Sequence, residues 1–162
     1  MSKLLFLIST LFLFSCSSLK TNLNREYIEF NHHNVMVIKN DRINIKLIPN
    51  YSKKGKNVKV KILYQGKKLE DKTITFSDYD EIKNKVKNID REDLVMPRII
   101  NKGKSNEHLV GISDGGQNSI LLYENNSKVL YSTTGFNQDY HKSFYSAVEK
   151  IFNTLNIKLT SL

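Results

Sequence analysis

The chain has 162 residues and a formal net charge of +9, with 25 Lys and Arg residues against 16 Asp and Glu residues. This length suits a single domain. A basic balance suits nucleic acid or anionic lipid as a partner. However, only Arg25, Arg42, Arg91 and Arg98 supply the guanidinium groups that surfaces contacting phosphates and bases favour. The composition therefore predicts no nucleic-acid partner and leaves anionic lipid head groups open.

An apolar run opens the chain. Lys3 precedes a segment from Leu4 to Phe14 in which only Ser9 and Thr10 are polar. The run is too short to cross a hydrocarbon core, which requires roughly 20 apolar residues in a helix. A positive charge followed by a short apolar stretch is typical of a secretory signal peptide. Residues 1–15 are therefore predicted to be a signal peptide.

The end of this run, Leu13-Phe14-Ser15-Cys16, resembles the lipobox of bacterial lipoproteins, although Phe14 replaces the usual small or β-branched residue. The resemblance implies cleavage between Ser15 and Cys16, a diacylglyceryl group on the Cys16 thiol and an acylated new amino group. Two or three acyl chains hold a protein firmly on a bilayer. A plain signal peptide followed by a buried Cys16, and an uncleaved helix in the core, are the alternatives.

Cys16 is the only cysteine in the chain, so its lipidation leaves no thiol for disulfides, zinc or nucleophilic catalysis. The next residue is Ser17 rather than Asp, and residues 17–23 contain no acidic side chain. By analogy with lipoproteins of Gram-negative bacteria, this pattern favours the outer membrane, with the protein facing the periplasm. Residues 16–26 would form the lipidated cysteine and a polar tether, and residues 27–162 a single domain.

The first half of that domain shows the period-two alternation of half-buried strands. Strands are expected around Val35 and Val37, around residues 43–47, and over residues 57–64 with lysines on the wet face. Pro49, Asn50 and residues 52–56 are expected in a turn or loop. Gln65-Gly66-Lys67 predicts a hairpin turn, and residues 72–76 the returning strand.

A first helix is expected from Ser77 to about Asp90. Ser77 and Asp80 have the spacing of a capping box. Apolar residues then recur at spacings of three and four, which predicts one buried stripe. The stripe consists of Tyr79, Ile82, Val86 and Ile89.

The second half, after a polar connection over residues 101–107, repeats this plan. Strands are expected over residues 109–112, 119–123 and 128–132, with turns at residues 114–117 and at Asn125-Asn126. A loop over residues 135–138 leads to a closing helix over residues 139–156. Its predicted stripe is Tyr140, Phe144, Val148, Ile151 and Leu155. The fold class is therefore α+β, an antiparallel sheet with two amphipathic helices on one face.

The stretch from Asp114 to Phe152, DGGQNSILLYENNSKVLYSTTGFNQDYHKSFYSAVEKIF, resembles a C-terminal pattern of many small uncharacterised bacterial proteins, including envelope lipoproteins of Bacteroidota type. The resemblance implies a hairpin, a glycine-containing loop and a closing helix. It implies no activity that is assigned to a residue.

Sites for catalysis or metals are not predicted. His32 and His33 are adjacent and would face opposite sides of a strand, while His108 and His141 lack ligand partners apart from Asp139, which lies two residues before His141. No metal-binding or phosphate-loop motif is present. The glycines of Asp114-Gly115-Gly116 are expected to serve a tight hairpin through positive φ. No metal and no cofactor is therefore expected.

A partner-binding role is instead predicted for loops. Phe136, Asn137 and Gln138 combine an aromatic ring with hydrogen-bonding groups, and Asp114 and Gln117 form a second candidate. The alternative is that Phe136 staples the start of the closing helix. The expected function is a lipid-anchored, non-enzymatic binding module of the cell envelope. Two alternatives are an immunity or inhibitor lipoprotein that neutralises a toxin or enzyme in the periplasm, and an envelope hydrolase.

Overall fold

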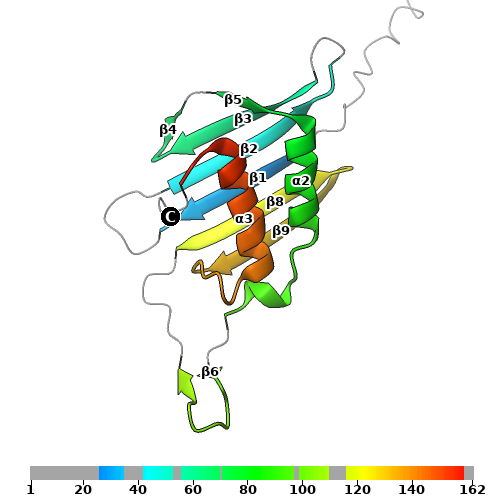
Figure 1. Ribbon diagram of the computed structural model, residues 1–162. Coiled ribbons are helices and arrows are strands. Elements are labelled where there is room, and N and C mark those ends of the chain that lie inside the picture. Colours follow the sequence, from blue (N-terminus) through cyan, green and yellow to red (C-terminus); the bar gives the residue numbers. More distant parts are fainter. Residues whose placement is uncertain are drawn as a thin grey trace, which may run out of the picture.

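An antiparallel sheet with two helices on one of its faces forms the domain (Figure 1). The computed structural model describes residues 26–34, 42–52, 56–69, 71–96, 99–109 and 116–158. Within these ranges the main sheet has seven strands in the order β4-β3-β2-β1-β8-β9, and β5 also pairs with β3. The predicted α+β class is thus confirmed. The strands are β1 (Tyr27–His33), β2 (Arg42–Asn50), β3 (Asn57–Tyr64), β4 (Lys67–Lys68), β5 (Lys72–Ile74), β8 (Gln117–Glu124) and β9 (Ser127–Thr134).

The central strand β1 is missing from the sequence prediction. It pairs with β2 on one side and β8 on the other. Ile28, Phe30 and His32 are buried on the helix side and alternate with half-buried residues. The polar third position, His32, hides an alternation that is otherwise regular. The strand expected around Val35 and Val37 lies outside the described residues.

Strand β2 continues through Pro49 and Asn50, where a turn was expected. Its pairing with β1 ends at Ile28 opposite Leu47, whereas its pairing with β3 continues to Asn50 opposite Asn57. Pro49 therefore lies where β2 is paired on one side only in the described part of the chain. Such an edge position tolerates the missing N–H of proline.

The tight turns predicted at Gln65-Gly66 and at Asn125-Asn126 are confirmed. Gln65 and Gly66 have φ of 52° and 78°, and Asn125 and Asn126 have φ of 51° and 60°. Two successive positive φ values are typical of the type I′ turn, whose twist matches that of a hairpin.

Helix α2 (Phe76–Lys87) begins one residue earlier than predicted, because its N-cap is Thr75. The Thr75 Oγ1 accepts from the Asp78 N–H at 3.1 Å, and the Asp78 carboxylate accepts from the Thr75 N–H at 3.3 Å. This capping box replaces the predicted one at Ser77 and Asp80, and it shortens the preceding strand to Ile74. The predicted stripe is buried, including Ile89 just beyond the helix.

Helix α3 (Lys142–Leu155) begins later than predicted. The Asn137 Oδ1 accepts from the N–H groups of Asp139 and Tyr140 at 2.7 and 3.3 Å, which holds residues before the helix in a separate turn. An N–H group at the start of the helix finds its hydrogen-bond acceptor in another element, because the Asp93 carboxylate accepts from the Ser143 N–H at 2.9 Å. Hydrogen bonds from the Ser143 hydroxyl and then from the Ser143 N–H lower the pKa of Asp93.

Asp93 belongs to the 3₁₀ helix η1 (Glu92–Leu94). The connection that follows contains a small separate hairpin, β6 (Ile99–Ile100) paired with β7 (His108–Leu109). Of the strand expected over residues 109–112, only Leu109 lies in the described range, and it belongs to this hairpin instead of the main sheet.

The core lies between the helix layer and the sheet. Inward residues of β1, β2, β3 and β8 meet the stripes of α2 and α3, which include Phe144, Val148, Ile151 and Leu155 as predicted. Tyr140 precedes α3 and is only half-buried. Among the described residues no helix combines the length and the apolar character needed to cross a bilayer.

Glu26 fixes the start of β1. Its carboxylate lies 2.7 Å from the Lys83 Nζ and accepts from the hydroxyls of Tyr51 and Tyr79 at 2.9 and 3.0 Å. Lys83 also contacts Glu124 at 2.5 Å. Burial would lower the pKa of Lys83, but the two carboxylates outweigh it and raise that pKa. The end of the predicted tether is therefore attached to α2 and to the end of β8.

Candidate functional site

The face of the sheet opposite the helices carries side chains that the core does not use. Burial alternates along each long strand, and both α2 and α3 lie on the same side of the sheet (Figure 1). We call the other side the open face. Its side chains are those of Tyr27, Glu29, Asn31, His33, Arg42, Asn44, Lys46, Ile48, Lys59, Lys61, Leu63, Gln117, Ser119, Leu121, Tyr123, Lys128, Leu130, Ser132 and Thr134.

The open face is strongly basic. Its cations in the set above are Arg42, Lys46, Lys59, Lys61 and Lys128, while Glu29 is the one carboxylate of that set. Lys68 of β4 lies on the same side, opposite Leu63, and pairs with Asp71 at 2.8 Å. Lys46 pairs with Glu29 at 3.0 Å. Within the described part of the chain the other three lysines have no carboxylate at ion-pair distance. The helix layer, by contrast, mixes both signs.

An aromatic pair lies on the open face where β1 begins, and a polar network lies beside it on β1 and β2. Tyr27 and Tyr123 stack with centroids 5.2 Å apart, and the Lys46 Nζ lies 3.7 Å from the centroid of the Tyr27 ring. The Asn44 Nδ2 donates to Glu29 at 2.7 Å and to Asn31 at 2.6 Å. Neighbouring side chains thus hold one another in place across β1, β2 and β8.

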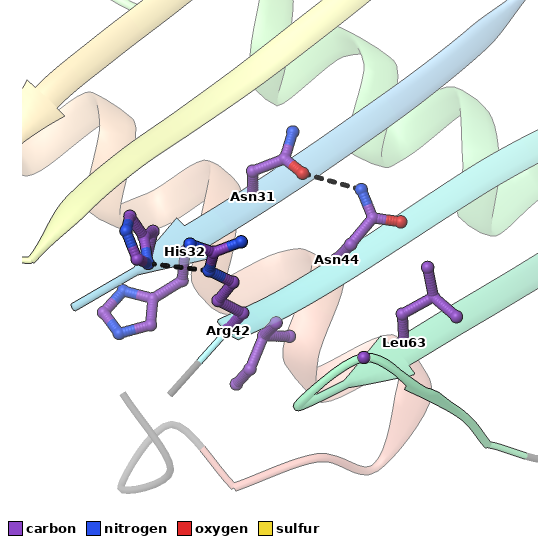
Figure 2. A pocket seen from close by; sticks show the side chains of 8 residues that line it. Asn31, His32, Arg42, Asn44 and Leu63 are labelled. Carbon is purple, nitrogen blue, oxygen red and sulfur yellow. Dashed lines mark hydrogen bonds between the residues drawn. The ribbon is translucent and has the colours of Figure 1, made fainter. Parts of the chain in front are cut away.

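A pocket of about 390 Å³ lies at the end of the open face where β1 ends and β2 begins. Figure 2 shows Asn31, Arg42, Asn44 and Leu63 around it. The Arg42 Nε donates to the His33 Nδ1 at 3.2 Å, so the proton of a neutral His33 ring lies on Nε2. The pocket offers a guanidinium, amides and an apolar wall, which suit an anionic group. Among the described residues its lining contains no carboxylate and no Ser, Thr, Cys or Lys side chain.

A buried polar network supports this end of the sheet from the helix side. The Asn118 Nδ2 donates to the carbonyls of Gly116 and Gly135 at 3.3 and 3.1 Å, so its Oδ1 accepts from the His32 Nδ1 at 2.8 Å. His32 and His33 therefore face opposite sides, as predicted.

Gly116 has a different role from the predicted one. It does not have positive φ. Instead, a Cβ at this position would lie 2.7 Å from the His32 Cε1 and 3.3 Å from the His33 carbonyl oxygen. The glycine is needed because the chain passes close to β1.

The predicted binding loop has structural contacts. Phe136 stacks on Tyr145 with centroids 4.7 Å apart and contacts Phe144 edge-on, which is the contact pattern of the alternative staple interpretation. Asn137 is engaged in the turn described above, whereas Gln138 is exposed. Gln117 lies on the open face, opposite His33 and Thr134. Asp114, like Ser15 and Cys16, lies outside the described residues. The binding role of these residues stays a prediction.

His141 connects the same loop to β9. Its Nδ1 accepts from the Asn137 N–H at 3.2 Å, so its Nε2 carries the proton and donates to the Thr133 Oγ1 at 2.8 Å. Burial lowers the pKa of His141. Both ring nitrogens are thus used in holding the fold.

A second pocket, of about 510 Å³, lies between α2 and α3. Lys150 pairs with Glu81 across it, and the Lys85 Nζ donates to the Ser146 Oγ at 2.9 Å. These contacts join the two helices. Elsewhere in the described ranges, no three His, Cys, Asp or Glu side chains lie close enough together to hold a metal ion.

The residues that β1 contributes to the open face, Tyr27, Glu29 and Asn31, were not predicted from the sequence. The available signal was the alternation of Ile28 and Phe30 with polar neighbours directly after the predicted tether. Comparison of the chain with family models, with curated proteins and with solved structures found no match.

Proposed function

We propose that the chain is a lipid-anchored protein of the bacterial cell envelope, held on the outer membrane through Cys16 and facing the periplasm. Its folded domain acts as a non-enzymatic binding module for another envelope component. The open face is the binding surface.

The open face supports this proposal because it presents features of recognition surfaces on a rigid antiparallel sheet. Tyrosines, amides and basic side chains lie together there, and no layer of described residues covers them. Tyr and Arg are enriched at interfaces. The side chains on the helix side are used in packing, and its two buried histidines are used in hydrogen bonds that hold the fold.

The anchor and the binding surface are tested separately. Cys16→Ser should abolish acylation, because only the thiol accepts the diacylglyceryl group, and should leave an uncleaved precursor. Mass spectrometry of the mature N-terminus and detergent partitioning measure this. A wild-type protein recovered from the aqueous phase without acyl mass would contradict the anchor.

For the surface, a photo-crosslinking residue is placed at Ser132 on the open face, at Glu149 on α3 and at Gln138 in the loop, all exposed positions. In intact cells we expect adducts from position 132 and none from position 149. Adducts from position 138 alone would favour the loop of the sequence prediction. Equal capture at positions 132 and 149 would contradict a specific surface.

A further inference from the structure

The charges of the domain are divided between its two sides. Lys59 and Lys61 are exposed on the open face of β3, and Lys128 is exposed on that of β9. On α2, three acidic residues in the first half balance three lysines in the second half, and Lys83 and Lys87 are paired with Glu26 and Glu124. The excess positive charge therefore lies on one side of the domain, where Glu29 and Asp71 compensate only part of it within the described residues.

The chain enters the domain beside this surface. Glu26 is fixed by Lys83, Tyr51 and Tyr79, and Tyr27 on the open face follows directly. Residues 17–25 connect Glu26 to Cys16. Even fully extended they span only about 30 Å, so a lipid on Cys16 keeps the open face close to the bilayer surface.

The side chains nearest the tether suit a bilayer interface. Tyr27 and Tyr123 are stacked there, and Lys46 lies over the Tyr27 ring. Tyrosine is enriched at the level of lipid head groups because its ring is apolar and its hydroxyl is polar. Lysines close to an anionic leaflet are attracted to lipid phosphates.

We infer that the partner of the open face is the anionic bilayer surface itself, with Lys59, Lys61 and Lys128 facing lipid phosphates and the tyrosine pair at head-group level. This inference rests on the proposed function, since it names the ligand of the same face. A lipid anchor leaves a domain free to rotate about its tether, and a basic patch adds the second contact. The contact orients the domain, so that the helix layer faces away from the membrane.

Vesicle flotation tests the inference without the lipid anchor. The protein is the chain from residue 17 to residue 162, which contains the whole described core. The vesicles are phosphatidylethanolamine with phosphatidylglycerol, or phosphatidylethanolamine with phosphatidylcholine as the uncharged comparison. The open-face variant is Lys59→Glu with Lys61→Glu. The matched control is Lys85→Glu with Lys142→Glu, both exposed in the helix layer, which changes the net charge equally. Thermal melting followed by circular dichroism checks that each variant is folded.

We expect binding to phosphatidylglycerol vesicles at low salt and its loss at about 1 M salt, where the screening length is about 3 Å. The open-face variant should bind at least about tenfold more weakly, and the control less than about threefold more weakly. Absence of wild-type binding, or equal weakening of both variants, would overturn the inference. If vesicles are not bound while position 132 crosslinks to a protein in cells, the ligand is a protein, and the proposed function stands without this inference.

Discussion

Replacement of Asn118 by alanine tests whether the buried amide holds β1, β8 and the loop after β9 together. Asn118 is fully buried, and its amide makes three hydrogen bonds, to Gly116, Gly135 and His32. In Asn118→Ala the Gly116 oxygen keeps the Gly135 N–H, which lies at 2.8 Å. The His32 Nδ1–H and the Gly135 oxygen lose the amide as a partner.

The expected loss in the free energy of unfolding follows from these two groups. A buried polar group without a partner costs about 1–3 kcal/mol, so we expect a loss of about 3 kcal/mol in the free energy of unfolding. With a urea slope of about 2 kcal/mol/M, the midpoint should fall by about 1.5 M. Ser132→Ala, at an exposed site on neighbouring β9, should change the stability by less than about 0.5 kcal/mol.

A double-mutant cycle separates the hydrogen bond from general disruption. His32→Phe keeps most of the ring volume and removes the donor. If the bond to Asn118 matters, the double variant should lose at least about 0.5 kcal/mol less than the sum of the single losses. Additive losses, or an Asn118→Ala midpoint equal to that of Ser132→Ala, would refute the reasoning.

Four further predictions concern the fold, each measured as free energy of unfolding in urea. Gly116→Ala should cost about 1–3 kcal/mol, because its Cβ would meet His32 at 2.7 Å; wild-type stability would show that the ring moves freely. Phe144→Ala should cost about 3–5 kcal/mol, whereas Lys150→Ala, with an exposed ion pair, should cost less than about 1 kcal/mol; equal losses would place the wrong face of α3 in the core. Thr75→Ala should cost about 1 kcal/mol through the lost N-cap, and no loss would argue against the capping box. Burial lowers the pKa of His141 from the ordinary 6.5. As the pH falls, the His141 ring is therefore protonated at a higher pH in the unfolded chain than in the folded protein. The contribution of His141 is therefore complete above about pH 6.5 and falls as the pH decreases toward the folded pKa; His141→Gln should flatten that fall, and an unchanged pH profile would contradict it.

Periodic features of the sequence predicted the fold well. The buried stripes of α2 and α3 were predicted except for Tyr140, which precedes α3, because apolar residues that recur at spacings of three and four define one helix face without tertiary information. The turns at Gln65-Gly66 and Asn125-Asn126 were also predicted, because their residues tolerate positive φ.

Features that depend on distant contacts were missed or misassigned. The close approach at Gly116 is created by His32, and the His32 bond to Asn118 joins residues 86 positions apart. The start of α3 depends on Asp93, which lies 50 positions before Ser143. Strand β1 was overlooked because its third inward residue is a histidine, and a histidine counts as buried only when its partner is known.

The same contacts explain why the open face is suited to binding. Its strands are fixed at one end by Glu26 and Lys83 and at the other by His32 and Asn118, so neither end of β1 relies on a ligand for order. The ion pair of Lys46 with Glu29 and the hydrogen bond from Asn44 to Asn31 then fix the orientation of side chains on the face itself. A ligand that meets a preorganised surface loses less of its binding free energy to ordering the protein. Packing the helices on one side of the sheet thus leaves the opposite side both rigid and free to make contacts.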